Sequence, residues 1–268
     1  MLKKRLIFTL LYEDGNFMLS RNFRLQNVGN LNWLEKNYDF SKISYSIDEL
    51  IVLDVTRGKR NFDKFCETLK ALTKGCFVPI SAGGGIVDFN LAHKLLRSGA
   101  DKVVINSELF GKSQLVEKLA SEFGKQCIVA SVDIKFSDIF GYQIWSHSGT
   151  LCQEVEASSQ LEIILSDSIG EIYLNSMDKD GTGQGLDLGL LDLLPNLTSK
   201  PVILAGGAGN SEHLLKAFMD SRVDAVATAN LFNFVGTGLS DARRFLVTKG
   251  VDLPIWNQIV ERSYENNR

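Results

Sequence analysis

The sequence predicts an α/β protein, a (βα)8 TIM barrel built from two duplicated half-barrels. Short apolar runs typical of strands alternate with amphipathic helical patterns, and eight such runs occur along the chain. A glycine-rich segment also occurs twice, at residues 79–85 and 201–209. An open doubly wound sheet would carry its glycine fingerprint after the first strand. Here the glycines follow the third and seventh predicted strands, so the sequence favours the barrel.

The predicted strands lie, in chain order, at residues 6–11, 50–55, 78–82, 102–106, 127–133, 172–175, 202–205 and 225–229. Helix signals separate them: Asp88 can cap one helix, which stops before Gly99, and Ser211 opens a later one. An offset of 122 residues aligns the first four strands with the last four. We therefore expect one barrel domain over residues 1–252, with half-barrels of about 1–125 and 126–252. Residues 253–268 read as a polar C-terminal tail.

Composition limits the classes of partner. The 268 residues carry a net charge of -3, which argues against general nucleic-acid binding. No apolar run approaches the roughly 20 residues that span a bilayer, and the start of the chain looks like a first strand, not a signal peptide. The four cysteines have no CxxC spacing. We expect a cytoplasmic protein with no metal, no cofactor, no nucleic acid and no membrane partner.

The two glycine-rich segments predict phosphate binding, because glycines between a strand and a helix can cradle a phosphate on backbone N–H groups. A single glycine pair would indicate only a tight turn, but two in register favour two phosphate sites. The first cluster contains Gly84, Gly85, Asn106 and Ser107. The second contains Asp180, Gly181, Thr182, Gly206, Gly207, Ala229 and Asn230. The expected ligand is a phosphorylated small molecule with a phosphate at each end.

Asp133 is the candidate catalytic residue, a carboxylate at the end of an otherwise apolar strand. It is placed to act as a general acid or base at the barrel mouth, or alternatively to cap a helix or pair with Lys135. The matching position in the first half is Leu11, which cannot transfer a proton. Glu13 shares the parity of the first strand but lies beyond its predicted end.

Four charged residues stand at the starts of strands one, two, four and six: Arg5, Glu49, Lys102 and Glu171. Each alone could be a solvated charge. Together they predict a ring of paired charges at the base of the barrel, since an isolated buried charge is costly. Paired side chains of this kind could form a polar gate.

From residue 1 to about 250 the chain resembles the HisF family, the cyclase subunit of imidazole glycerol phosphate synthase. The matching segments include residues 83–86, 99–103, 178–182 and 206–209. The resemblance implies a barrel that receives ammonia from a HisH-type glutaminase docked on its base. It implies that Arg5, Glu49, Lys102 and Glu171 form the ammonia gate, that Asp101 is a docking contact, and that Asp133 is one of two catalytic aspartates of a lyase. The second aspartate is Leu11 here, and the lysine of the first loop falls on Leu19.

This pattern is most similar to the divergent WbuZ-type HisF-like proteins of surface-polysaccharide loci. That likeness implies an ammonia-channelling synthase subunit that works with a glutaminase and a sugar amidotransferase. Together they would supply the ammonia for making an acetamidino group on a bacterial surface sugar. Two alternatives stay open: an authentic imidazole glycerol phosphate synthase cyclase of histidine biosynthesis, and a non-catalytic scaffold that binds a phosphorylated ligand. Leu11 makes the histidine-pathway reaction doubtful, because acid–base chemistry there needs a titrating group.

Overall fold

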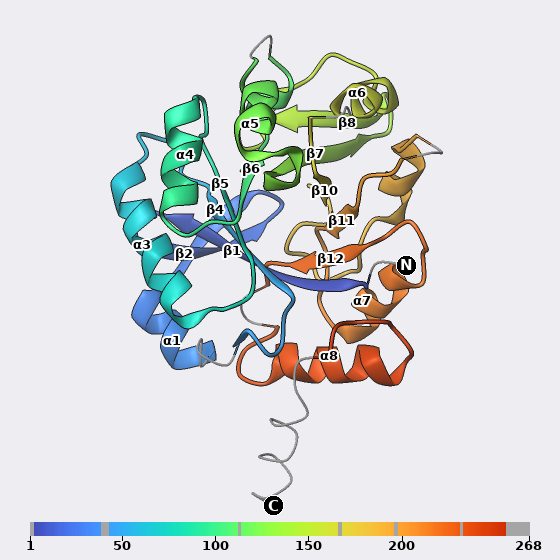
Figure 1. Ribbon diagram of the computed structural model, residues 1–268. Coiled ribbons are helices and arrows are strands. Elements are labelled where there is room, and N and C mark those ends of the chain that lie inside the picture. Colours follow the sequence, from blue (N-terminus) through green and yellow to red (C-terminus); the bar gives the residue numbers. More distant parts are fainter. Residues whose placement is uncertain are drawn as a thin grey trace, which may run out of the picture.

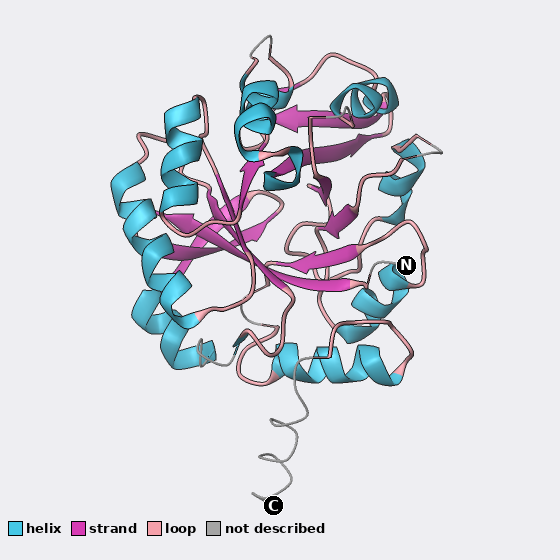
Figure 2. Cartoon of the chain, in the orientation of Figure 1, coloured by secondary structure: helices cyan, strands magenta, loops and turns pink. Residues whose placement is uncertain are grey.

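The computed structural model describes residues 3–38, 43–111, 114–165, 168–195, 198–230 and 233–255. Eight parallel strands lie in the order β10-β11-β12-β1-β4-β5-β6-β7, and β10 also pairs with β7, which closes the barrel. Helices surround these strands (Figures 1 and 2). The prediction of a (βα)8 barrel is confirmed.

The barrel strands cover all eight predicted ones. They are β1 (Arg5–Glu13), β4 (Glu49–Asp54), β5 (Ile80–Gly83), β6 (Lys102–Ile105), β7 (Ile128–Ser137), β10 (Glu171–Ser176), β11 (Val202–Ala205) and β12 (Ala225–Thr228). The α-helices are α1 (Leu31–Tyr38), α3 (Phe62–Gly75), α4 (Phe89–Arg97), α5 (Leu115–Phe123), α6 (Ala157–Ile164), α7 (Ser211–Phe218) and α8 (Gly238–Thr248). Short 3₁₀ turns are η1 (Ser107–Leu109), η2 (Lys125–Cys127) and η3 (Leu188–Leu193).

Helix starts follow the capping residues. Asp88 caps α4 as predicted, accepting a hydrogen bond from Leu91 N at 2.9 Å. The cap of α7 is Asn210, one residue before the predicted Ser211, and its side chain accepts from His213 N at 3.0 Å.

Two hairpins that the sequence did not predict extend the barrel. Strands β2 (Asn16–Arg21) and β3 (Arg24–Asn30) continue from β1, and β8 (Gly141–Ser146) and β9 (Leu151–Cys152) continue from β7. The turn at Asp14 and Gly15, with φ of 43° and 88°, joins β1 to the antiparallel β2. This is the two-residue hairpin turn that an Asp-Gly pair favours.

The alternation of side chains along each strand places every second residue inside the barrel. A small apolar cluster fills the middle of the interior and includes Ile7, Ile51, Val129 and Tyr173. Charged side chains lie below this cluster and polar ones above it. A larger apolar core lies between the strands and the surrounding helices.

Residues 256–268 of the predicted tail lie outside the described residues, and the half-barrel duplication stays a prediction. In the part of the chain that the structure describes, no helix could cross a membrane.

Candidate functional site

A cavity of about 440 Å³ opens at the carboxyl ends of the barrel strands, the end at which TIM barrels carry their active sites. Asp133 and Leu11 both line it, as do nearly all residues predicted for phosphate binding. Thr182 is the exception: it is not part of the lining, and its hydroxyl donates to the Lys179 carbonyl at 2.8 Å. The fold therefore brings both glycine clusters and the candidate catalytic carboxylate to one cavity.

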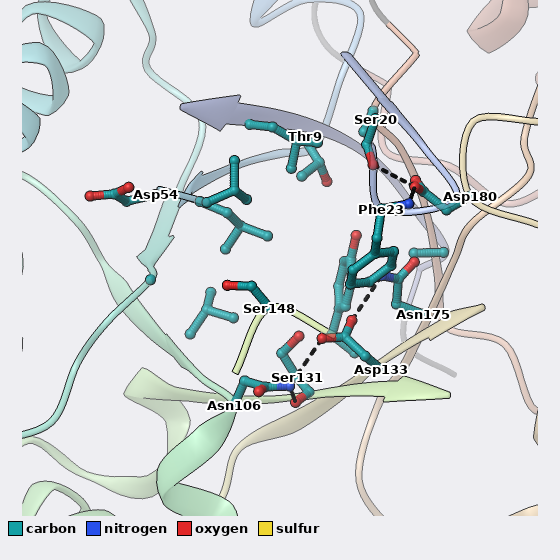
Figure 3. Close-up of a pocket in the computed structure, with 18 of the residues that line it drawn as sticks. Thr9, Ser20, Phe23, Asp54, Asn106, Ser131, Asp133, Ser148, Asn175 and Asp180 are labelled. Atoms are coloured by element: carbon teal, nitrogen blue, oxygen red, sulfur yellow. Dashed lines mark hydrogen bonds between the residues drawn. The ribbon is translucent and has the colours of Figure 1, made fainter. Parts of the chain in front are cut away.

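Asp133 is held by two amide side chains from the neighbouring strands (Figure 3). Asn175 Nδ2 donates to Asp133 Oδ1 at 2.9 Å, and Asn106 Nδ2 donates to Oδ2 at 3.2 Å. Burial raises the pKa of Asp133 to about 6, the Asn175 hydrogen bond opposes the rise, and repulsion from Asp180 adds to it. A carboxyl group with this pKa can take up or release a proton near neutral pH.

We predict that an NMR titration of the Asp133 side-chain carbon has its midpoint at a pH of about 6. The near-isosteric Asn175→Leu change should raise that midpoint further, because it removes a donor to the charged form. Because the pKa of Asp133 in the folded protein exceeds the ordinary aspartate value of 3.8, ionisation of Asp133 costs stability, and the free energy of unfolding should fall as pH rises between these two values. A midpoint near 3.8 would show that burial does not control this carboxyl group.

Leu11 lies inside the cavity at the position predicted for a second carboxylate. It is 9% exposed, and its neighbour across the sheet is Leu53 of β4, which also lines the cavity. Glu13 lies at the end of β1, where it pairs with Asn16 in the hairpin, and it is not among the residues that line the cavity. Among the described residues it offers no substitute carboxylate in this cavity.

Tyr173 is a cavity residue that sequence reasoning missed. It is 5% exposed and faces the barrel interior one pleat below Asn175. Burial raises the pKa of its phenol, and the Thr9 hydroxyl beside it opposes that rise. The phenol is therefore a proton donor, not a base, at neutral pH. Its position within an apolar strand gave no sign of this role.

The β2–β3 hairpin covers part of the cavity. Its turn residues Asn22 and Phe23 have φ of 49° and 61°, a left-handed conformation that asparagine tolerates but that is unusual for phenylalanine. Asp180 holds the hairpin, since its carboxylate accepts from Ser20 Oγ at 2.5 Å and from Phe23 N at 2.9 Å. The Phe23 ring extends toward Asn175 and Asp133 (Figure 3). The predicted phosphate-site residue Asp180 thus has a structural contact as well.

Two of the predicted glycines are required by close backbone contacts. A Cβ on Gly84, whose φ is +110°, would lie 2.1 Å from the Asp54 carbonyl oxygen. A Cβ on Gly206, whose φ is +88°, would lie 2.5 Å from the Ser176 carbonyl oxygen. Both glycines let the chain turn tightly beside the strand end, so that the loop backbone lines the cavity.

At the other end of the barrel the four predicted charges form a closed ring of ion pairs. Arg5 contacts Glu49 at 2.8 Å and Glu171 at 2.6 Å, and Lys102 contacts Glu49 at 3.0 Å and also pairs with Glu171. Ser81 Oγ donates to Glu49 as well, at 2.5 Å. We call Arg5, Glu49, Lys102 and Glu171 the charge ring; that it is a gate stays a prediction.

The ring is stabilised by mutual attraction. Burial works against the charged forms, but the opposite charges outweigh it, so the pKa of Arg5 and of Lys102 is raised and that of Glu171 is lowered. The two carboxylates are 2% and 6% exposed, whereas the two cations are 22% and 18% exposed. The carboxylates therefore depend on the cations for compensation.

Asp101 lies exposed at the base, directly before β6. Its carboxylate accepts a hydrogen bond from Ile80 N at 2.8 Å, at the start of β5. Asp224 makes the same contact to Val202 N at 2.9 Å, between β12 and β11. Asp101 thus has a role within the fold, and its docking role remains a prediction. No cluster of His, Cys, Asp or Glu in the described ranges could hold a metal ion.

Comparison with known proteins identifies relatives of this chain. A family model described as "Histidine biosynthesis protein" matches residues 34–236. The "Putative imidazole glycerol phosphate synthase subunit hisF2" of Parasynechococcus marenigrum is 46% identical over 245 residues, 91% of this chain and 90% of that protein. The "Imidazole glycerol phosphate synthase subunit HisF" of Streptococcus gordonii is 33% identical over 95% of this chain and 100% of its own length. The protein of that name from Chlorobaculum tepidum is 33% identical over 94% and 98%.

Proposed function

This chain belongs to the HisF family of histidine biosynthesis proteins, and from that premise we propose that it is the ammonia-receiving synthase subunit of a glutamine amidotransferase. Its partner in this proposal is a HisH-type glutaminase docked on the base of the barrel. Ammonia released by the partner enters at the charge ring and reaches the cavity at the mouth, where a phosphorylated ligand binds.

The observation that carries the proposal is the charge ring at one end of the barrel with Asp133 at the other. Four balanced charges with two nearly buried carboxylates are costly to keep at a barrel base. A scaffold that only binds a ligand has no use for these four charges, whereas a barrel that admits a small polar molecule at its base can use them as the entrance. Above the ring the interior is apolar, with Ile7, Ile51 and Val129, which suits neutral ammonia better than ammonium.

The presence of Leu11 argues against the histidine-pathway reaction. Asp133 alone can accept a proton from an attacking ammonia molecule, because its carboxylate is mostly ionised above a pH of about 6. The cyclisation implied by the resemblance uses two carboxylates, and the wall opposite Asp133 is formed by Leu11 and Leu53. Passing ammonia on to the sugar amidotransferase, in line with the acetamidino hypothesis, forms and breaks no bond in this barrel and so needs no second carboxylate.

The names of the relatives favour a second candidate, an imidazole glycerol phosphate synthase cyclase. A direct assay with ammonia and the histidine-pathway substrate separates the two. We expect no turnover. A rate typical of ordinary enzymes, about 1 per second or more, would support the cyclase and contradict our proposal.

The partner can be tested without knowing the substrate. The chain, mixed with the HisH-type glutaminase of its own organism, should elute as a complex in gel filtration, and Asp101→Lys should weaken that complex because it reverses an exposed charge on the base. Asp241→Lys, an exposed change on α8, provides the control. Failure to form any complex would remove the source of ammonia and with it the proposal.

A further inference from the structure

The Tyr173 side chain crosses the barrel interior. Tyr173 belongs to β10, yet its phenol lies beside the hydroxyl of Thr9 on β1, which affects its pKa. Strands β11 and β12 stand between β10 and β1 in the sheet. Their interior residues at this level are Ala205 and Ala227, which belong to the same buried cluster as Tyr173. These small side chains leave room for the ring, so the ring lies at the floor of the mouth cavity, which all four residues line.

Thr9 carries a buried hydroxyl that the fold does not use. The residue is 1% exposed, and its Oγ1 has no hydrogen-bond partner within the described ranges. In Figure 3 Thr9 lies across the cavity from Asp133. An unpaired buried polar group costs about 1–3 kcal/mol. A small polar molecule bound at Thr9 would remove that cost.

The two hydroxyls have different roles toward such a molecule. Burial raises the pKa of the Tyr173 phenol, and the carboxylates of Asp133 and Asp180 raise it further, so the phenol keeps its proton and donates. The Thr9 oxygen has two lone pairs and can accept. A molecule that joins them must therefore accept one hydrogen bond and donate another.

Neutral ammonia meets both requirements. Its lone pair accepts from the phenol, and its N–H groups donate to Thr9. Ammonium has no lone pair and cannot accept, and the surrounding Ile7, Ala205 and Ala227 disfavour a cation. Water can also bridge the two hydroxyls, but ammonia is the stronger base and is therefore the better acceptor for the phenol proton.

We propose that Thr9 and Tyr173 form a binding site for neutral ammonia at the floor of the mouth cavity. Tyr173 Oη donates to the nitrogen lone pair, and Thr9 Oγ1 accepts an N–H of ammonia. This rests on the proposed function, which brings ammonia up from the base, and it names the place where ammonia leaves the apolar interior. Asp133, across the cavity, is the next acceptor beyond this site. No covalent bond changes at the site.

Titration of the whole chain with ammonium chloride tests the site. The ring carbon signal of Tyr173 in ¹³C NMR, assigned by its absence in Tyr173→Phe, should shift and saturate. We expect the same midpoint at two alkaline pH values when it is expressed as the concentration of neutral ammonia. Potassium chloride is the control, because potassium has the charge of ammonium but neither a lone pair nor an N–H group, and it should cause no saturable shift.

Two conservative variants separate the hydroxyls. Tyr173→Phe removes the donor and keeps the ring, and Thr9→Val removes the acceptor and keeps the shape. Each should weaken ammonia binding about tenfold, because one hydrogen bond is lost and its partner stays unpaired. The Thr9 methyl signal reports binding in the first variant and the Tyr173 ring signal in the second. Thr9→Val should not lower the free energy of unfolding, since the hydroxyl has no partner to lose.

Tyr142→Phe is the matched control. The phenol of Tyr142 lies on β8, donates to Asp187 at 3.1 Å and is not part of the cavity lining. Its loss should change the ammonia midpoint less than about twofold. A loss as large as that of Tyr173→Phe would overturn the proposal, as would a midpoint that follows ammonium instead of ammonia, an equal shift with potassium chloride, or no saturable shift.

The glutaminase complex provides a separate readout. Thr9 and Tyr173 lie toward the barrel mouth and the proposed docking face is the base, so both variants should still form the complex. A chain that binds the glutaminase but shows no saturable ammonia site would contradict this inference alone. A chain that binds ammonia at this site but no glutaminase would contradict the proposed function alone.

Discussion

Replacing Lys102 by methionine should lower the free energy of unfolding by about 3 kcal/mol. The change removes one of the two cations that face Glu49 and Glu171 and leaves these nearly buried carboxylates with Arg5 alone. Methionine keeps the length of the side chain, so lost packing contributes little. Chemical denaturation followed by circular dichroism measures the effect.

A surface pair provides the control. Lys94 of α4 pairs with Asp63 of α3, and both side chains are well exposed. Lys94→Met removes this pair and should hardly change stability. The double change Lys102→Met with Glu171→Gln should recover most of the loss, because it removes one charge of each sign. The Lys102→Met deficit should also shrink in acid, where a protonated Glu171 needs no cation. If Lys102→Met is as harmless as Lys94→Met, the ring is solvated and its pairs are weak.

Gly181→Ala should have the second large effect, a loss of about 3 kcal/mol and the release of the β2–β3 hairpin. The added Cβ would lie 1.9 Å from the Ser20 carbonyl oxygen, at a φ of +66° that alanine rarely adopts. Backbone atoms cannot move aside alone, so the contacts of Asp180 with Ser20 and Phe23 should break. Hydrogen exchange of the Phe23 amide reports that release, and denaturation reports the stability.

Gly141→Ala separates strain from collision. Gly141 has nearly the same φ, +69°, but nothing lies within 4 Å of its added Cβ. This variant should lose only about 1 kcal/mol, the cost of the left-handed conformation. Equal losses in the two variants would mean that the hairpin contact contributes nothing.

The sequence was sufficient for the barrel because all eight parallel strands are apolar runs bounded by clear helix and turn signals. It also identified Asp133, whose carboxylate stands out at the end of an apolar strand, and the four ring charges, which share one position on their strands. These features depend on local pattern and strand parity alone.

The covering hairpin was not predicted, for a physical reason. Residues 16–30 are polar and weakly alternating. They form strands only because β1 extends past the barrel rim and pairs with β2, which in turn pairs with β3.

The charge ring also constrains the order in which the barrel can be completed. Arg5, Glu49 and Lys102 all leave the ribosome before Glu171, because synthesis proceeds from the N-terminus. During that interval two cations share one carboxylate, and the base of the growing chain carries an unmatched positive charge. Only the arrival of β10 neutralises it, in the same step that lets β7 gain its second parallel neighbour. The charges of the base are thus balanced before the barrel can close, because β11 and β12, which connect β10 to β1 in the sheet, follow later in the chain.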